Sequence, residues 1–99
     1  MKTLAVMPLR LTAREKETLY EAAIDAVDSC LEEKAELIKI EETEPLKYLG
    51  AYITAMHEAE VLVFPPFYSD SQICRLIAQI ATIYDKTCIY EQRNDDGIN

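Results

Sequence analysis

A buried β-strand that leads directly into a helix is the feature of this sequence that most restricts its fold. Val61–Phe64 is an uninterrupted run of β-favouring apolar residues, typical of a central parallel strand covered on both faces. Pro65 and Pro66 end the strand, because proline has no N–H group to donate to a neighbouring strand. An amphipathic helix is expected next, with inward side chains at helical spacing: Ile73, Leu76, Ile77, Ile80 and Tyr84.

The start of this helix allows two interpretations. Ser69 is the expected N-cap, and Gln72, three residues later, completes a capping box. In the first interpretation Asp70 also serves only to cap the helix. In the second, Asp70 and Ser71 contact a ribose or a phosphate, since helix N-termini that follow strands bind such groups. The residues alone leave both open.

The rest of the chain alternates between strand and helix. Thr3–Met7 is a predicted first strand, and residues 36–40 a half-exposed second strand that is expected at an edge of the sheet. Thr12 and Glu15 form a capping box before the first helix, whose expected inward residues are Tyr20, Ile24, Val27 and Leu31. Pro45 is suited to begin the second helix, whose expected inward residues are Leu46, Leu49, Ile53 and Met56. Thr87–Tyr90 is the predicted fourth strand.

This alternation predicts an α/β fold with a single three-layer domain over residues 1–91 and a flexible polar tail over residues 92–99. The expected sheet is parallel, four-stranded and of order 2-1-3-4, the flavodoxin-like or Rossmann-like arrangement. Its switch point lies between the first and third strands, so the loops after them should meet there. The candidate ligand-binding residues are therefore Pro8, Leu9, Arg10, Pro66, Tyr68, Ser69, Asp70, Ser71 and Ile77.

Composition narrows the class of protein. Residues 15–44 contain eleven acidic and three basic residues, which accounts for the whole net charge of −8. An acidic face disfavours nucleic acid as a partner. It is either a solvated surface, or a surface that mimics nucleic acid or docks on a basic host protein. Cys30, Cys74 and Cys88 are odd in number and widely spaced, so we expect reduced thiols, a cytoplasmic protein and no metal site. No apolar run approaches the ~20 residues that a membrane span requires.

The second half of the chain resembles small phage and prophage proteins related to nucleoside 2-deoxyribosyltransferases. The resemblance covers residues 45–91 without a gap, and the N-terminal strand with Met7–Leu9 more weakly. The segments that carry it are Pro45–Leu49, Met56–Glu60, Tyr68–Asp70, Cys74–Leu76, Ala81–Tyr84 and Cys88–Glu91. It implies the same α/β fold, a nucleotide-like ligand and self-association.

The departures from that family are as informative. In the transferases a glutamate early in the third helix attacks the anomeric carbon of the sugar, and the matching position here is Ile77. A second family glutamate falls on Gln79, and the helix-two aspartate of the enzymes falls near Tyr52. An aliphatic side chain cannot act as a nucleophile. The chain has only two glycines, Gly50 and Gly97, and neither lies in the predicted ligand loops, so a phosphate cradle is poorly supported.

Two functional hypotheses follow from these residues. The first is a non-catalytic member of this family, without a cofactor, that binds a nucleotide-like molecule or a protein. The second is an N-glycosidase or deoxyribosyltransferase with a non-standard set such as Glu58, Tyr68 and Asp70. His57, the only histidine, is expected on the surface. A homodimer through the second or third helix is also expected, with Tyr48, Tyr52 and Tyr84 as interface candidates and core packing as the alternative.

Overall fold

The computed structural model of the chain describes residues 1–91 and consists of one α/β domain. The strands are β1 (Lys2–Ala5), β2 (Glu36–Ile38), β3 (Val61–Phe64) and β4 (Thr87–Tyr90). The helices are α1 (Ala13–Leu31), α2 (Pro45–Met56) and α3 (Gln72–Ile83), with a short 3₁₀ helix, η1, at Tyr68–Asp70 before α3. The predicted tail at residues 92–99 lies outside the described residues.

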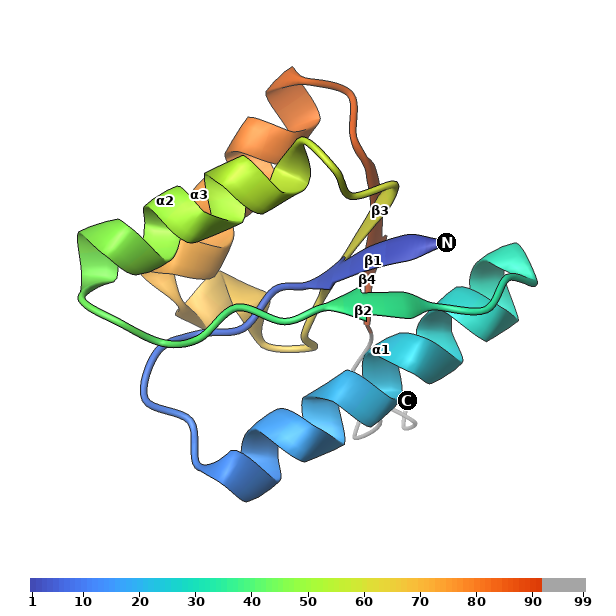
Figure 1. The fold of residues 1–99 in the computed structure, drawn as a ribbon, viewed down its shortest axis with the longest axis horizontal. Coiled ribbons are helices and arrows are strands. Elements are labelled where there is room, and N and C mark those ends of the chain that lie inside the picture. Colours follow the sequence, from blue (N-terminus) through green and yellow to red (C-terminus); the bar gives the residue numbers. More distant parts are fainter. Residues whose placement is uncertain (92–99) are drawn as a thin grey trace, which may run out of the picture.

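The four strands form one parallel sheet of order β2-β1-β3-β4, which confirms the predicted fold class and topology. β2 lies at an edge, as predicted, but it is three residues long and ends at Ile38 rather than at residue 40. α1 lies on one side of the sheet, and α2 and α3 lie together on the other (Figure 1).

The core divides into two layers because side chains alternate across the central strands. Leu4, Val6, Leu62 and Phe64 face α2 and α3, whereas Ala5, Val61 and Val63 face α1. All four residues of β3 are buried, as the apolar run predicts. Among residues 1–91, no helix combines the length and the hydropathy needed to span a bilayer.

The buried face of α2 differs from the predicted one. Tyr48 and Tyr52 are each 1% exposed and contact the sheet, whereas the predicted core residues Leu46 and Ile53 are 83% and 45% exposed. Both sets have helical spacing, so periodicity could not separate them. The helix turns its tyrosines inward because the sheet offers backbone partners for their hydroxyl groups, as described below. The prediction that Tyr48 and Tyr52 form an oligomer interface is therefore wrong.

Three further details correct the sequence predictions. Tyr84 is 72% exposed rather than inward, so it stays a candidate for a contact surface. Ile24 is 40% exposed, since Ala23 and Val27 supply the fully buried positions of α1. Ser71, not Ser69, caps α3: its hydroxyl accepts a hydrogen bond from the Cys74 N–H (3.3 Å), while Ser69 lies within η1. Thr12 and Glu15 form the predicted capping box at α1.

Candidate functional site

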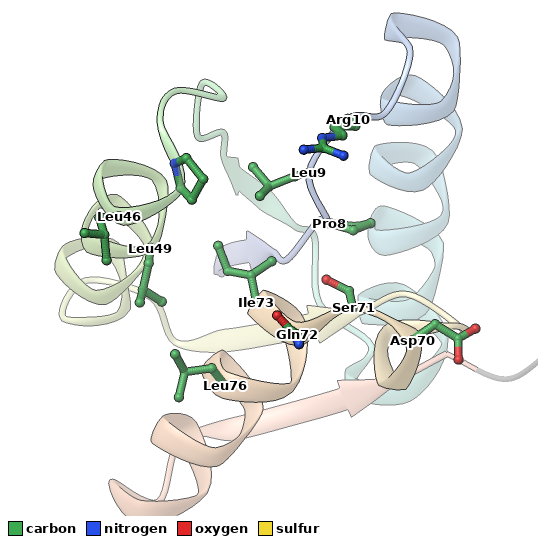
Figure 2. A pocket seen from close by; sticks show the side chains of 11 residues that line it. Pro8, Leu9, Arg10, Leu46, Leu49, Asp70, Ser71, Gln72, Ile73 and Leu76 are labelled. Atoms are coloured by element: carbon green, nitrogen blue, oxygen red, sulfur yellow. The ribbon is translucent and has the colours of Figure 1, made fainter.

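An open groove lies at the carboxyl edge of the sheet, at the predicted switch point. It has a volume of about 600 Å³ and lies between the β1–α1 loop, the start of α2 and the start of α3. Figure 2 shows the side chains around it. The residues that line this groove are Pro8, Leu9, Arg10, Pro45, Leu46, Leu49, Asp70, Ser71, Gln72, Ile73 and Leu76.

The walls of the groove are mainly aliphatic. Leu9 enters from the β1–α1 loop, Leu46 and Leu49 from α2, and Ile73 and Leu76 from α3 (Figure 2). Leu46 and Leu76 are 83% and 41% exposed, so much of this apolar surface faces solvent. An apolar hollow with a few polar groups at its rim is the usual composition of a small-molecule site.

The polar groups occupy one end of the groove. Arg10 lies above Leu9, and Ser71 and Gln72 stand at the N-terminus of α3 (Figure 2). The partial positive charge of a helix N-terminus and the Arg10 guanidinium are both suited to an anionic group. The Asp70 carboxylate points away from the leucine and isoleucine side chains (Figure 2). The groove therefore presents positive rather than negative charge to a molecule bound between the leucines.

Two buried tyrosines of α2 hold the backbone that enters the groove. The Tyr48 hydroxyl donates to the Met7 carbonyl (3.0 Å), and the Met7 N–H donates to the Tyr52 hydroxyl (3.1 Å). The two hydroxyl groups lie 3.1 Å apart, and that of Tyr52 also donates toward the Ala5 carbonyl at 3.3 Å. Burial raises the pKa of both tyrosines above the ordinary value, so they are neutral hydrogen-bonding groups at physiological pH.

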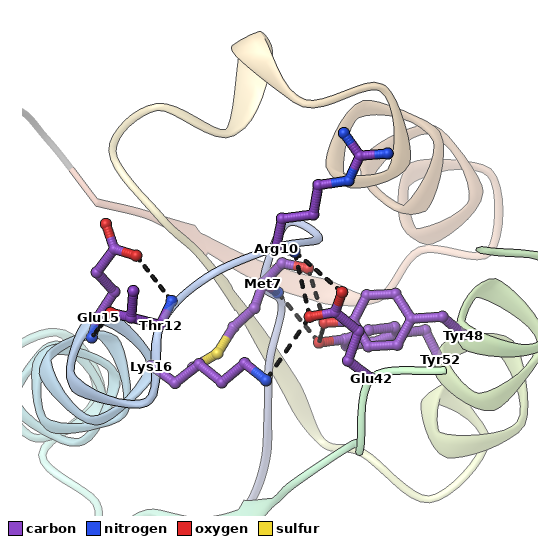
Figure 3. A network of polar contacts seen from close by, with 8 residues as sticks. All are labelled: Met7, Arg10, Thr12, Glu15, Lys16, Glu42, Tyr48 and Tyr52. Atoms are coloured by element: carbon purple, nitrogen blue, oxygen red, sulfur yellow. Dashed lines mark hydrogen bonds and ion pairs between the residues drawn. The ribbon is translucent and has the colours of Figure 1, made fainter. Parts of the chain in front are cut away.

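Glu42 holds the same loop from the other side. Both carboxylate oxygens accept from the Arg10 N–H (3.0 and 3.1 Å), and Lys16 of α1 lies 3.7 Å from the same carboxylate (Figure 3). Arg10 has a φ of 67°, a conformation that costs a non-glycine residue roughly 1 kcal/mol. The charge-assisted bonds from Glu42 offset this cost. The Arg10 side chain extends away from Glu42, toward α3 (Figure 3).

The structure brings together five of the nine predicted ligand-binding residues: Pro8, Leu9, Arg10, Asp70 and Ser71. The others do not line the groove. Ile77 is fully buried in the core under α3, and Tyr68 faces a different hollow beside β4. Pro66 and Ser69 lie in the β3–α3 connection outside the lining.

Sequence reasoning missed Leu46, Leu49, Ile73 and Leu76 as groove residues, because their helical spacing matched an inward stripe. One feature of the sequence could have identified them. The segment that forms α2 has two apolar faces, one made of two leucines and an isoleucine and the other made of tyrosines. A helix on the surface of a small sheet can bury only one of them. The other had to be exposed or cover a hollow.

The alternative catalytic set is not assembled. Glu58 lies near the amino ends of the strands, where it pairs with Lys2 of β1 (3.6 Å), whereas Asp70 lies at their carboxyl ends. Tyr68 packs against Phe64 and Tyr90 beside β4. His57 is exposed at the end of α2, on the same side of the sheet as Glu58. Within residues 1–91, no three His, Cys, Asp or Glu side chains are grouped to hold a metal ion.

Comparison of the chain with protein-family models, curated proteins and solved structures found no match. The function is therefore inferred from the groove and from the residues that line it.

Proposed function

We propose that this chain is a non-catalytic binding module whose groove takes a nucleoside or a nucleoside monophosphate. The observation that carries the proposal is the composition of the groove: aliphatic walls from three segments, with Arg10 and the N-terminus of α3 at one end. Aliphatic walls suit the faces of a planar base, and the positive end suits a single phosphate. The volume of about 600 Å³ is in the range of small-molecule sites.

The charge of the groove limits the ligand class. Arg10 is its only basic residue, and the protein as a whole has a net charge of −8. A triphosphate needs several cations or a bound metal to offset its charge. We therefore favour ligands with at most one phosphate group.

The lack of catalysis follows from the same residues. Cleavage of an N-glycosidic bond requires a carboxylate within reach of the anomeric carbon. Asp70 is the only acidic residue of the lining, and its carboxylate points away from the aliphatic walls (Figure 2). The resemblance to nucleoside 2-deoxyribosyltransferases and their phage relatives supports the ligand class, and the aliphatic residue at the nucleophile position, Ile77, supports the loss of chemistry.

Isothermal calorimetry against nucleosides, nucleoside monophosphates and cyclic nucleotides tests the binding. We expect Leu76→Glu to abolish binding of all three, because it places a carboxylate in the groove wall. Ile53→Glu is the matched control: Ile53 has similar exposure (45% against 41%) on α2, but it does not line the groove. Arg10→Gln should weaken the binding of nucleoside monophosphates about tenfold or more and leave the affinity for nucleosides nearly unchanged.

Two outcomes would contradict the proposal. If no ligand of these classes binds, or if Ile53→Glu weakens binding as much as Leu76→Glu, the groove is not the site. Release of free base from a nucleoside, measured by chromatography in the same samples, would show that the protein is an enzyme.

A second candidate function is docking on a basic protein. The solvent side of α1 carries an exposed acidic row, Glu17, Glu21, Asp25 and Asp28. Such a row raises association rates with basic partners, in a manner that salt screens. A pull-down experiment tests this function with the wild type and with a variant in which these four residues are changed to Gln or Asn. The function would be favoured if the wild type captures a basic host protein and the variant does not, while the variant still binds ligands in the groove.

A further inference from the structure

Within residues 1–91, no strand pairs with the outer edge of β4, and the strand itself carries none of the charges or prolines that normally protect an edge. β4 is the outermost strand opposite β2, and its sequence, Thr-Cys-Ile-Tyr, has no charge and no proline. β2, at the other edge, is only three residues long, begins with Glu36 and is followed by Lys39. Uncharged edges readily pair with another strand, so proteins usually protect them with charges, prolines or bulges.

The backbone of β4 presents hydrogen-bonding groups at this edge. The Glu91 N–H donates to the Phe64 carbonyl of β3 (3.0 Å). Because successive residues of a strand face opposite neighbours, Ile89 also bonds to β3, and Cys88 and Tyr90 direct their N–H and C=O groups away from it. Two residues of β4 are therefore positioned to pair with a further strand.

A hollow flanks the edge on each face of the sheet. On the α3 side a hollow of about 550 Å³ lies between Tyr90 and Arg75, Gln79 and Ile83. On the α1 side a hollow of about 460 Å³ lies between Ile89 and Ala22, Asp25 and Cys30. An added strand alternates its side chains between the two faces, so it would place them in both hollows.

We propose that two copies of this chain pair antiparallel through β4, with Ile89 opposite Ile89 of the second copy, and form one continuous eight-stranded sheet. In a two-fold arrangement of this register, Cys88 of each copy lies opposite Tyr90 of the other. The outward groups of these residues then form about four hydrogen bonds. The interface is separate from the groove, so this inference is independent of the proposed function.

The polar side chains of the strand favour a second copy as the occupant. The Lys86 ammonium before β4 already donates to the Ala59 carbonyl (3.3 Å), so Thr87 and Glu91 are the polar side chains that a second copy meets. In this register Thr87, which is exposed, lies opposite Glu91 of the second copy, and its hydroxyl can donate to that carboxylate. Burial already raises the pKa of Glu91, so a donor or a cation beside it would stabilise the charged form.

Charge changes at Thr87 test the register without disturbing the core. We expect light scattering to show a dimer of the wild type at tens of micromolar. Thr87→Glu places like charges opposite each other at two symmetric positions and should raise the dimer dissociation constant about tenfold. Thr87→Lys should lower it. The combination of Thr87→Glu with Glu91→Lys should restore dimerisation, because it places opposite charges at the two facing positions.

Crosslinking tests the same register independently. In a variant with Cys30→Ser, Ile89→Cys should form a disulfide-linked dimer under mild oxidation, because the two Cα atoms would be about 4.5 Å apart. Thr87→Cys in the same background is the control, since its two copies would be separated along the strands. A monomeric wild type at hundreds of micromolar would overturn the proposal. So would a dimer whose dissociation constant neither Thr87→Glu nor Thr87→Lys changes, because its interface would lie elsewhere.

Discussion

The hydroxyl groups of Tyr48 and Tyr52, one helical turn apart on α2, lie 3.1 Å from each other and together bind both backbone polar groups of Met7. Their rings meet edge to face at 84°, with centroids 5.0 Å apart. This pair joins α2 to the end of β1 at the point where the chain enters the groove. It is the contact that decides which face of α2 is buried.

Tyr52→Phe should lower the free energy of unfolding by about 1–3 kcal/mol. The change leaves the buried Met7 N–H without the acceptor that it has in the wild type, and an unsatisfied buried donor costs about this much. Urea denaturation followed by circular dichroism measures the difference. Tyr84→Phe is the control. Tyr84 is 72% exposed, so the loss of its hydroxyl group should change the free energy of unfolding by less than about 0.5 kcal/mol. Equal effects of the two changes would contradict the role of the tyrosine pair.

Stability should fall as the pH rises above 10. Burial raises the pKa of Tyr52, and also that of Tyr48, above the ordinary value of 10.0 that both have in the unfolded chain. Above pH 10 the unfolded tyrosines lose protons that the folded ones keep. Stability that is complete below pH 10 is therefore lost by about 1.4 kcal/mol per pH unit through Tyr52, and Tyr48 adds to this loss until the pH passes its own folded pKa. Urea denaturation from pH 8 to 11 should show a shallower decline for Tyr52→Phe than for the wild type. Parallel declines would show that the hydroxyl is not protected in the folded state.

Ser71→Ala should cost about 1 kcal/mol, because Ser71 caps α3 through its bond from the Cys74 N–H. Ser69→Ala should change stability by less than about 0.5 kcal/mol, although Ser69 has the spacing of a capping box. Thermal and urea denaturation of the two variants provide a direct comparison of two serines that are two positions apart. The reverse order would mean that α3 begins at the position that the sequence pattern predicts.

Ile77→Glu should destabilise the protein by at least about 3 kcal/mol and should create no glycosidase activity. Ile77 is fully buried in the core under α3, so the new carboxyl group would lie in an apolar environment rather than in the groove. Gln79→Glu, at the exposed position of the second family glutamate, is the control and should fold like the wild type. Denaturation and assays of base release check both outcomes. A stable, active Ile77→Glu protein would show that the side chain reaches the site.

The sequence alone determined the order and kind of the elements. An apolar run, two prolines and helical spacing define β3 and α3 locally, and strand-helix alternation leaves few ways to arrange a parallel sheet other than β2-β1-β3-β4. The same alternation predicted that Pro8–Arg10 and Asp70–Ser71 lie together, because both loops follow adjacent parallel strands.

The tertiary structure decided how each helix is rotated about its own axis. The leucine face and the tyrosine face of α2 have the same spacing, and only the Met7 backbone, more than forty residues away in the chain, selects the tyrosines. The rotation of α3 was likewise not evident from the sequence: it directs Ile77 into the core instead of into the groove. Periodicity indicates which residues share a face of a helix. The residues that this face contacts come from distant segments of the chain, so only the folded structure shows which face they bury.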